Sequence, residues 1–150
     1  MQPVEITPPG SRGTHMPQFA KAILGVMPRL YRLLNGRGMG PTLILTTVGA
    51  KSGRKREVHL TAFREGNGWL VVGSRGGSTG HPAWYLNMAR HPDDVWVQVG
   101  SRFTRVKPET LKGDARAKAW QRIVSKYSTY SAYQRSTDRE IPVIRLTPVA

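Results

Sequence analysis

A series of short strand-like runs separated by turns is the feature that most limits the folds open to this chain. Thr42–Val48 is apolar, and Val58, Leu60 and Ala62 alternate with residues of the opposite face, as in a half-buried strand. The predicted strands are 42–48, 57–64, 69–73, 95–99, 102–107 and 142–147. Strands in this order, with few helices between them, predict a mainly β domain of the α+β class, built as a small closed or split β-barrel.

Helical spacing marks three further segments. In 17–38 the apolar residues recur every three or four positions with lysine and arginine between them. Pro28 is expected to kink or divide this helix, and Gly36 to end it. The apolar stripe fits either a helix packed on the core or a basic amphipathic helix lying on an anionic membrane. Shorter inserted helices are predicted at 82–90 and 114–127.

The chain is expected to have three parts. Residues 1–16 show no periodicity, and Gly13–Met16 resembles a cloning junction. We therefore predict a disordered or vector-derived tail at 1–16, an amphipathic helix at 17–38 and one barrel domain at 39–150. No apolar segment typical of a secretory signal or a membrane span is visible.

A basic turn follows the first strand. Gly49–Arg56 places four cationic side chains beside glycines and a serine. Glycines let backbone N–H groups converge on one point, and the cations add positive charge. Such a turn suits a phosphate or carboxylate ligand, although a solvated hairpin tip has the same composition.

Composition narrows the chemistry. Lysine and arginine number 23 against 9 acidic residues, for a net charge of +14, which favours anionic partners. The absence of cysteine excludes disulfides and thiolate chemistry and agrees with a cytoplasmic protein. The four histidines show no ligand-like spacing, so no metal site is predicted. Any catalysis is expected to use an organic cofactor.

Three tyrosines lie close together at Tyr127, Tyr130 and Tyr133. Each hydroxyl needs a partner or water when it is buried, which is unusual for side chains that serve packing alone. The tyrosines fit either the core or a pocket for a flat, partly polar molecule.

Segments in this order resemble the deazaflavin (coenzyme F420)-dependent nitroreductase and quinone reductase family of actinobacteria. The matching segments are Leu45–Gly53, Gly73–Gly77, His81–Asn87, Tyr127–Tyr133 and Thr137–Val143. The resemblance implies a split β-barrel of the flavin-binding pyridoxamine-phosphate-oxidase-like type. It also implies an oxidoreductase that transfers hydride from reduced coenzyme F420 to a quinone such as menaquinone, or to a nitroaromatic acceptor.

The resemblance also assigns site residues. Cofactor-binding roles fall on Lys51, Ser52, Gly53, Arg54, Lys55, Arg56, Ser74, Arg75, Gly76, Gly77, Pro82, Trp84, Tyr85 and Asn87. The basic positions are expected to hold the phosphate and the acidic tail of the coenzyme. Tyr127, Tyr130 and Tyr133 are expected to line the substrate pocket. Tyr127 and Ser74 are the predicted catalytic hydroxyls, because hydride arriving at a quinone creates an oxyanion that needs a hydrogen bond.

Menaquinone is a membrane lipid, so the resemblance favours peripheral contact of 17–34 with the inner face of the cell membrane. Ile23, Met27, Leu30 and Leu34 are the expected lipid contacts, with Lys21, Arg29 and Arg32 at headgroup depth. Related barrels often dimerise, so a homodimer is possible in this reading.

Other classes remain open. The net charge alone would suit a nucleic-acid-binding module, although the cations gather at turns and nucleic acid is not the expected partner. A deazaflavin-, flavin- or haem-binding barrel without this activity is a further alternative, as is a carrier that holds the deazaflavin without catalysis.

Overall fold

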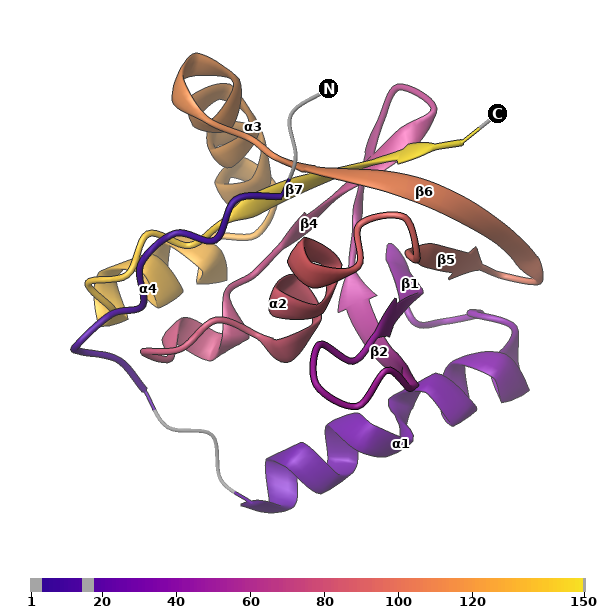
Figure 1. The fold of residues 1–150 in the computed structure, drawn as a ribbon. Helices are drawn as coiled ribbons and strands as arrows, with labels where there is room; N and C mark the ends of the chain where they lie inside the picture. Colours follow the sequence, from indigo (N-terminus) through magenta and orange to yellow (C-terminus); the bar gives the residue numbers. More distant parts are fainter. Residues whose placement is uncertain (1–3, 15–17, 150) are drawn as a thin grey trace.

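The computed structural model describes residues 4–14 and 18–149, with side chains from Ala22 onward in the second range. Seven antiparallel strands form one sheet in the order β2-β1-β5-β6-β7-β4-β3. The strands are β1 (Thr42–Val48), β2 (Lys55–Thr61), β3 (Phe63–Glu65), β4 (Gly68–Val72), β5 (Trp96–Val99), β6 (Arg102–Thr110) and β7 (Val143–Pro148). Because β2 and β3 stand at opposite ends of this order but are separated in the chain by Ala62 alone, the sheet curls into a half-barrel (Figure 1). The predicted split β-barrel is confirmed.

The observed strands follow the predicted ones with two differences. The strand expected at 57–64 is two strands, because residues up to Thr61 pair with β1 whereas Phe63–Glu65 pair with β4. β6 runs to Thr110, beyond the predicted end at 107, because its second half pairs with β7. Elsewhere the alternation of side chains between the two faces of the sheet sets which residues of neighbouring strands pair, as expected for strands that pack on both sides.

Two apolar cores lie on the two faces of the curled sheet. Inside the half-barrel, side chains from β1, β4, β5 and β7 pack around Trp84, Tyr85 and Met88 of α2 (Ala83–Arg90). On the outer face of β4 and β7, a second core receives Ala119 and Ile123 from α3 (Gly113–Lys126). β4 is buried along its whole length because it contributes to both cores.

Tyr130 and Tyr133 lie on a separate helix, α4 (Thr129–Ser136). The spacing of the tyrosines did not distinguish this helix from the one predicted at 114–127. Tyr127 has extended backbone geometry and ends α3, so the chain turns before α4 begins. α4 packs against the short 3₁₀ helix η1 (Arg75–Gly77) and against α3 (Figure 1).

Helix α1 (Gln18–Leu34) lies beneath β2 and is continuous across Pro28, so of the two expected effects, a kink or a division, the division does not occur. A proline removes only one N–H donor from the helix, and the turns on either side continue. The helix ends as predicted near Gly36, whose N–H donates to the carbonyl of Tyr31 at 2.9 Å while Asn35 takes φ of 53°. Tyr31 is the buried anchor of α1, and its hydroxyl accepts the N–H of Gly100.

The apolar stripe of α1 faces mostly outward. Ile23 is 56% exposed and Leu33 81% exposed, whereas Met27 is half-buried. Arg32, expected at headgroup depth, is instead paired with Glu57 on β2. The expected role of Lys21 lies outside the residues whose side chains are described.

Residues 4–14, within the predicted tail, form an extended strap along the molecule (Figure 1). Gly10 donates its N–H to the carbonyl of Thr79 at 2.8 Å, and Thr14 donates its N–H to that of Gly77 at 3.1 Å. The N–H groups of Ser11 and Arg12 bind the carboxylate of Asp138 at 2.8 and 2.9 Å. A segment without periodicity is therefore held by polar contacts, which periodicity cannot detect. The rest of the predicted tail lies outside the described residues.

Candidate cofactor site

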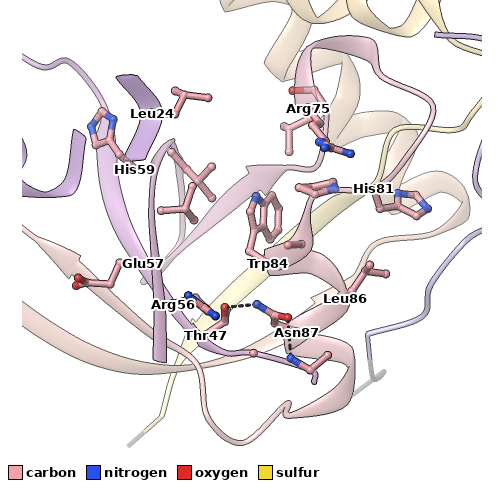
Figure 2. A pocket seen from close by; sticks show the side chains of 18 of the residues that line it. Leu24, Thr47, Arg56, Glu57, His59, Arg75, His81, Trp84, Leu86 and Asn87 are labelled. Carbon is pink, nitrogen blue, oxygen red and sulfur yellow. Dashed lines mark hydrogen bonds between the residues drawn. The ribbon is translucent and has the colours of Figure 1, made fainter. Parts of the chain in front are cut away.

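A cavity of about 870 Å³ opens between the β1–β2 turn, strand β2, the segment around η1 and helix α2. Figure 2 shows the side chains that line it. Nine residues predicted from the sequence to bind a cofactor line this cavity: Lys51, Ser52, Arg56, Ser74, Arg75, Gly76, Pro82, Trp84 and Asn87. The fold thus brings together three segments that are far apart in the sequence.

The β1–β2 turn is closed by its own hydrogen bonds. Gly49 donates its N–H to the carbonyl of Arg54 at 2.8 Å, and Gly53, with φ of 69°, donates to the carbonyl of Gly49 at 2.9 Å. The Ser52 hydroxyl accepts the N–H of Arg54 at 3.2 Å. Among the described residues, no acceptor meets the N–H groups of Lys51 and Ser52. Two free amide donors and a lysine therefore stand at one end of the cavity, as an anion site requires.

Asn87 of α2 braces this turn from the buried side. Its side-chain oxygen accepts the N–H of Ala50 at 3.0 Å, and its side-chain nitrogen donates to the Thr47 hydroxyl at 3.1 Å (Figure 2). Because both partners are on the β1 side of the turn, Asn87 fixes the turn relative to α2. Its role is to position the anion site, and it also lines the cavity.

The segment around η1 carries the second set of predicted residues. Arg75, Gly76 and Gly77 have φ of 43°, 63° and 79°, so three successive residues adopt left-handed backbone. The side chain of Ser74 makes no capping hydrogen bond to this turn. A hydroxyl and a guanidinium are therefore presented at the cavity wall by an unusually tight bend.

The cavity carries positive charge at two places, the β1–β2 turn and the segment around η1. Lys51, Arg56 and Arg75 line it, and the carboxylate of Glu57 is paired with Arg32 of α1. Burial lowers the pKa of His59 and of His81 below the ordinary value, so both imidazoles are neutral at physiological pH. The cavity therefore favours a ligand with an anionic end.

Five predicted cofactor residues do not line the cavity: Gly53, Arg54, Lys55, Gly77 and Tyr85. Lys55 and Arg56 are adjacent on β2 and so face opposite sides, which places Lys55 over the ring of Trp96 at 5.1 Å. Tyr85 is fully buried, and its hydroxyl donates to the carbonyl of Glu5 in the strap. These two residues contribute to packing instead of the cavity wall.

The three tyrosines are also outside the cavity lining. Tyr130 and Tyr133 pack on the outer core, with their rings 5.9 Å apart, and Tyr127 is 39% exposed and lies edge-on to Phe63. Burial raises the pKa of Tyr130, so its phenol stays protonated. The core interpretation of these tyrosines, left open by the sequence, describes Tyr130 and Tyr133 in this structure.

Sequence reasoning missed the apolar walls and the histidines. Val58, Leu60 and Val72 belong to ordinary strands, and only the curl of the sheet turns them toward one space. His59 and His81 had no recognisable partner in the sequence. Alternation did place Val58 and Leu60 on one face, which was the available signal.

Comparison with known proteins agrees with this geometry. The model of the F420H(2)-dependent quinone reductase family matches residues 28–148. The chain belongs to that family. A Mycobacterium tuberculosis protein of the same name is 38% identical over 135 residues, covering 83% of this chain and 89% of the relative. The family is one of oxidoreductases that use the reduced deazaflavin coenzyme F420.

Solved structures show the same fold. An F420-H2 dependent reductase is 39% identical, with a TM-score of 0.64 over 71% of this chain and 94% of that one. A structure described as a domain-swapped dimer is 33% identical, with a TM-score of 0.66 over 86% of this chain and 99% of that one. A Listeria innocua protein whose name refers to pyridoxamine 5′-phosphate oxidase shares the fold at 12% identity and a TM-score of 0.51.

The residues present fit the coenzyme of this family. A deazaflavin has a flat ring system and an anionic tail, so it needs apolar walls and a cationic end. Val58, Leu60 and Trp84 supply the former, and the unbonded amides of the β1–β2 turn with Lys51 and Arg56 supply the latter. In the part of the chain that the structure describes, no cluster of potential metal ligands occurs.

Proposed function

We propose that this chain oxidises reduced coenzyme F420 and passes the hydride to a quinone. The observation that carries the proposal is the cavity of about 870 Å³, which has apolar walls and the cations Lys51 and Arg56 beside the β1–β2 turn. A hydride donor with a flat ring and a polyanionic tail fits such a cavity, because the ring contacts the apolar walls and the tail contacts the cations.

Within this proposal the β1–β2 turn binds the anionic tail. Lys51 and Arg56 supply charge, and the N–H groups of Lys51 and Ser52 supply directed donors. Charge-assisted hydrogen bonds of this kind are stronger than neutral ones. Val58, Leu60 and Trp84 hold the ring and keep water from it. When bound, the coenzyme supplies a hydride, so the protein needs no nucleophile of its own.

The chain's own chemical task is to stabilise charge on the acceptor. A quinone that accepts hydride gains negative charge on an oxygen, and the Ser74 hydroxyl lies at the cavity wall without a capping bond. We assign Ser74 the hydrogen bond to that oxygen, with the proton following from water or from Tyr127. Since Tyr127 stands outside the cavity lining, its contribution is expected to be the smaller of the two.

Two measurements test the proposal. Fluorescence titration with coenzyme F420 should show saturable binding at micromolar concentration, and the reduced coenzyme should be oxidised steadily when menadione is added. Binding without turnover would make the protein a carrier. No binding at micromolar concentration would remove the proposed function.

The same site would serve nitroaromatic acceptors, because hydride arriving at a nitro group also places negative charge on oxygen. The assay is the same with a nitroaromatic in place of menadione. A quinone turned over while every nitroaromatic is left unchanged would confine the proposal to quinones.

We also propose that α1 rests on the inner face of the cell membrane from the cytoplasm, where a lipid quinone is found. In the described part of the chain no helix is long and apolar enough to cross a bilayer. Ile23, Val26 and Leu33 are more than half exposed, and such a face is suited to the headgroup boundary. Replacing all three with serine should abolish sedimentation with anionic liposomes while leaving menadione turnover in detergent unchanged. Equal sedimentation of the variant would remove the membrane contact.

A homodimer is the last part of this proposal. It is supported by the relative described as a domain-swapped dimer. Light scattering after size exclusion should give twice the chain mass. A monomer at tens of micromolar concentration would contradict it.

A further inference from the structure

Arg139 carries its positive charge in the protein interior, where cations are rarely found without a carboxylate partner. It precedes β7 and is 1% exposed. The neighbouring carboxylates are engaged elsewhere, since Asp138 binds the strap and Glu140 pairs with Arg116. Among the described residues, no carboxylate forms an ion pair with Arg139. A buried charge of this kind needs another source of compensation.

Backbone carbonyls of one segment provide that compensation. The guanidinium donates from Nη1 to the carbonyl of Gly73 at 2.9 Å, from Nη2 to that of Ser74 at 2.9 Å, and from Nε to that of Ser78 at 3.1 Å. All three acceptors belong to the segment 73–78, which forms one wall of the cavity. The planar fork of an arginine can satisfy several such acceptors at once, which a lysine cannot do.

The bonds bracket the strained part of that wall. Ser74 and Ser78 stand on either side of Arg75, Gly76 and Gly77, the three residues with left-handed backbone. Left-handed geometry is unfavourable for a non-glycine residue such as Arg75 and persists only where the surroundings determine it. Arg139 binds the carbonyl before the bend and the carbonyl after it, so it fixes the ends between which the bend must form.

His81 extends the same network to the strap. Arg139 has no acceptor atom, so its Nη1 donates to Nδ1 of His81 at 3.0 Å. The ring proton of His81 is then on Nε2, which donates to the carbonyl of Thr7 at 2.7 Å. The backbone of Arg139 is itself held in place, because the side chain of Gln134 donates to the backbone carbonyl of Arg139 at 2.7 Å.

We propose that Arg139 is a positioning residue for cofactor binding: its guanidinium holds segment 73–78 in the left-handed bend that brings Arg75 to the cavity and leaves the Ser74 hydroxyl unbonded. This inference rests on the proposed function for its ligand, the anionic coenzyme. Arg139 acts through Arg75 and Ser74, and it is not itself among the residues that line the cavity.

A double-mutant cycle on coenzyme affinity tests the inference. Arg139→Gln and Arg75→Ala should each raise the Kd for coenzyme F420 roughly tenfold. The two together should weaken binding little more than either alone, because Arg75 is already misplaced when Arg139 is lost. Lys51→Ala, on the separate β1–β2 turn, should multiply its effect with that of Arg139→Gln. Multiplicative effects of Arg139→Gln and Arg75→Ala would overturn the proposal.

Hydrogen exchange of the coenzyme-free protein gives a second readout that does not depend on the proposed function. The N–H groups of Gly77 and Ser78 close the bend by donating to the carbonyls of Ser74 and Arg75 at 2.8 and 3.2 Å. Arg139→Lys keeps the charge but loses the fork, so exchange of these amides should rise at least tenfold while β1 stays protected.

Arg116→Gln is the matched control, since Arg116 is also partly buried and binds the carbonyl of Ile141 but none in segment 73–78. Unchanged exchange in Arg139→Lys would overturn the proposal, and so would an equal rise in Arg116→Gln. If the wild-type protein failed to bind the coenzyme, the proposed function would fall while the exchange result still decided the role of Arg139.

Discussion

Two loops form the polar parts of the cavity, and they are held in opposite ways. The β1–β2 turn is closed mainly by bonds among its own residues, such as those from Gly49 to Arg54 and from Gly53 to Gly49. The segment 73–78 has two bonds of its own, from Gly77 to Ser74 and from Ser78 to Arg75. It is also held from outside by Arg139, more than sixty residues further along the chain, and by Thr14 of the strap, whose hydroxyl donates to the carbonyl of Gly76 at 2.7 Å. One loop is closed mainly within itself, whereas the other depends in addition on distant segments.

The difference indicates a division of labour. A locally closed turn can present its amides and cations before any ligand arrives, so it suits the tight grip on an anionic tail. A bend imposed from outside can carry strain that its own residues would release, so it suits side chains that must be placed accurately beside a reacting group. The predictions below separate these two contributions.

The largest expected effect is on the affinity of the β1–β2 turn for the anionic tail of the coenzyme. Replacing Lys51 and Arg56 together with alanine removes two charge-assisted contacts of about 1.5–3 kcal/mol each, so the Kd for coenzyme F420 should rise roughly a hundredfold or more. Turnover at saturating coenzyme should change little. Fluorescence titration and steady-state assays measure the two quantities.

The matched control uses the neighbouring cations. Arg54 and Lys55 carry the same charge but do not line the cavity, so their double alanine variant should bind with nearly the wild-type Kd. Equal losses in the two double variants would mean that net charge alone attracts the coenzyme and that the turn has no special geometry.

The next effect concerns segment 73–78 and should show in turnover. Ser74→Ala removes the proposed donor to the acceptor oxygen, and kcat should fall roughly tenfold to a hundredfold while the coenzyme Kd stays within about twofold. Tyr127→Phe should lower kcat less, because Tyr127 is outside the cavity lining. A larger fall for Tyr127→Phe than for Ser74→Ala would reverse the two assignments.

The same contrast explains what the sequence could and could not predict. The β1–β2 turn was recognisable because Gly49, Lys51, Ser52 and Gly53 are adjacent in the chain and their chemistry is local. The barrel followed from alternation along the strands. Arg139 was visible as part of a motif, but no local pattern says that its guanidinium reaches Gly73.

Three positions that the sequence could not place have the same cause. Tyr85 follows Trp84 in a motif, yet the helix turns its side chain into the core, where its hydroxyl donates a hydrogen bond to the backbone carbonyl of Glu5 in the strap. The strap itself lacks apolar periodicity, so its polar contacts were unpredictable before the fold was known. Tyr130 could not be placed because the chain breaks into a new helix at Thr129.

A smaller effect tests how far the β1–β2 turn depends on its outside brace. Asn87→Ala leaves the buried N–H of Ala50 and the Thr47 hydroxyl without their partner, which should cost about 1–3 kcal/mol of unfolding free energy. Because the turn is also closed by its own bonds, the coenzyme Kd should rise only about tenfold. Thermal unfolding and titration measure the two losses, with Thr47→Val as the control that removes one bond. A complete loss of binding in a folded Asn87→Ala protein would show that the turn is no more self-sufficient than segment 73–78.

The smallest effect is a pH dependence of the externally held segment. Burial is the largest influence on His81 and lowers its pKa below 6.5; the bond to the carbonyl of Thr7 raises the pKa by less, and the charge of Arg139 adds the smallest, lowering contribution. The unfolded chain therefore binds more protons than the folded one once the pH falls below about 6.5. The unfolding free energy is consequently at its maximum, as far as His81 is concerned, above that pH and decreases below it. His59, whose pKa burial also lowers, adds a decline of the same sign. Urea unfolding at pH 7.5 and 5.5 should show that the unfolding free energy falls less in His81→Gln than in the wild-type protein. His59→Gln measures the part of the fall that comes from His59, whose ring lies 5.5 Å from that of Tyr31 on α1. If His81→Gln declined as steeply as the wild-type protein, protonation of His81 would not govern the anchoring of segment 73–78 to the strap, and the contrast between the two loops would rest on Arg139 alone.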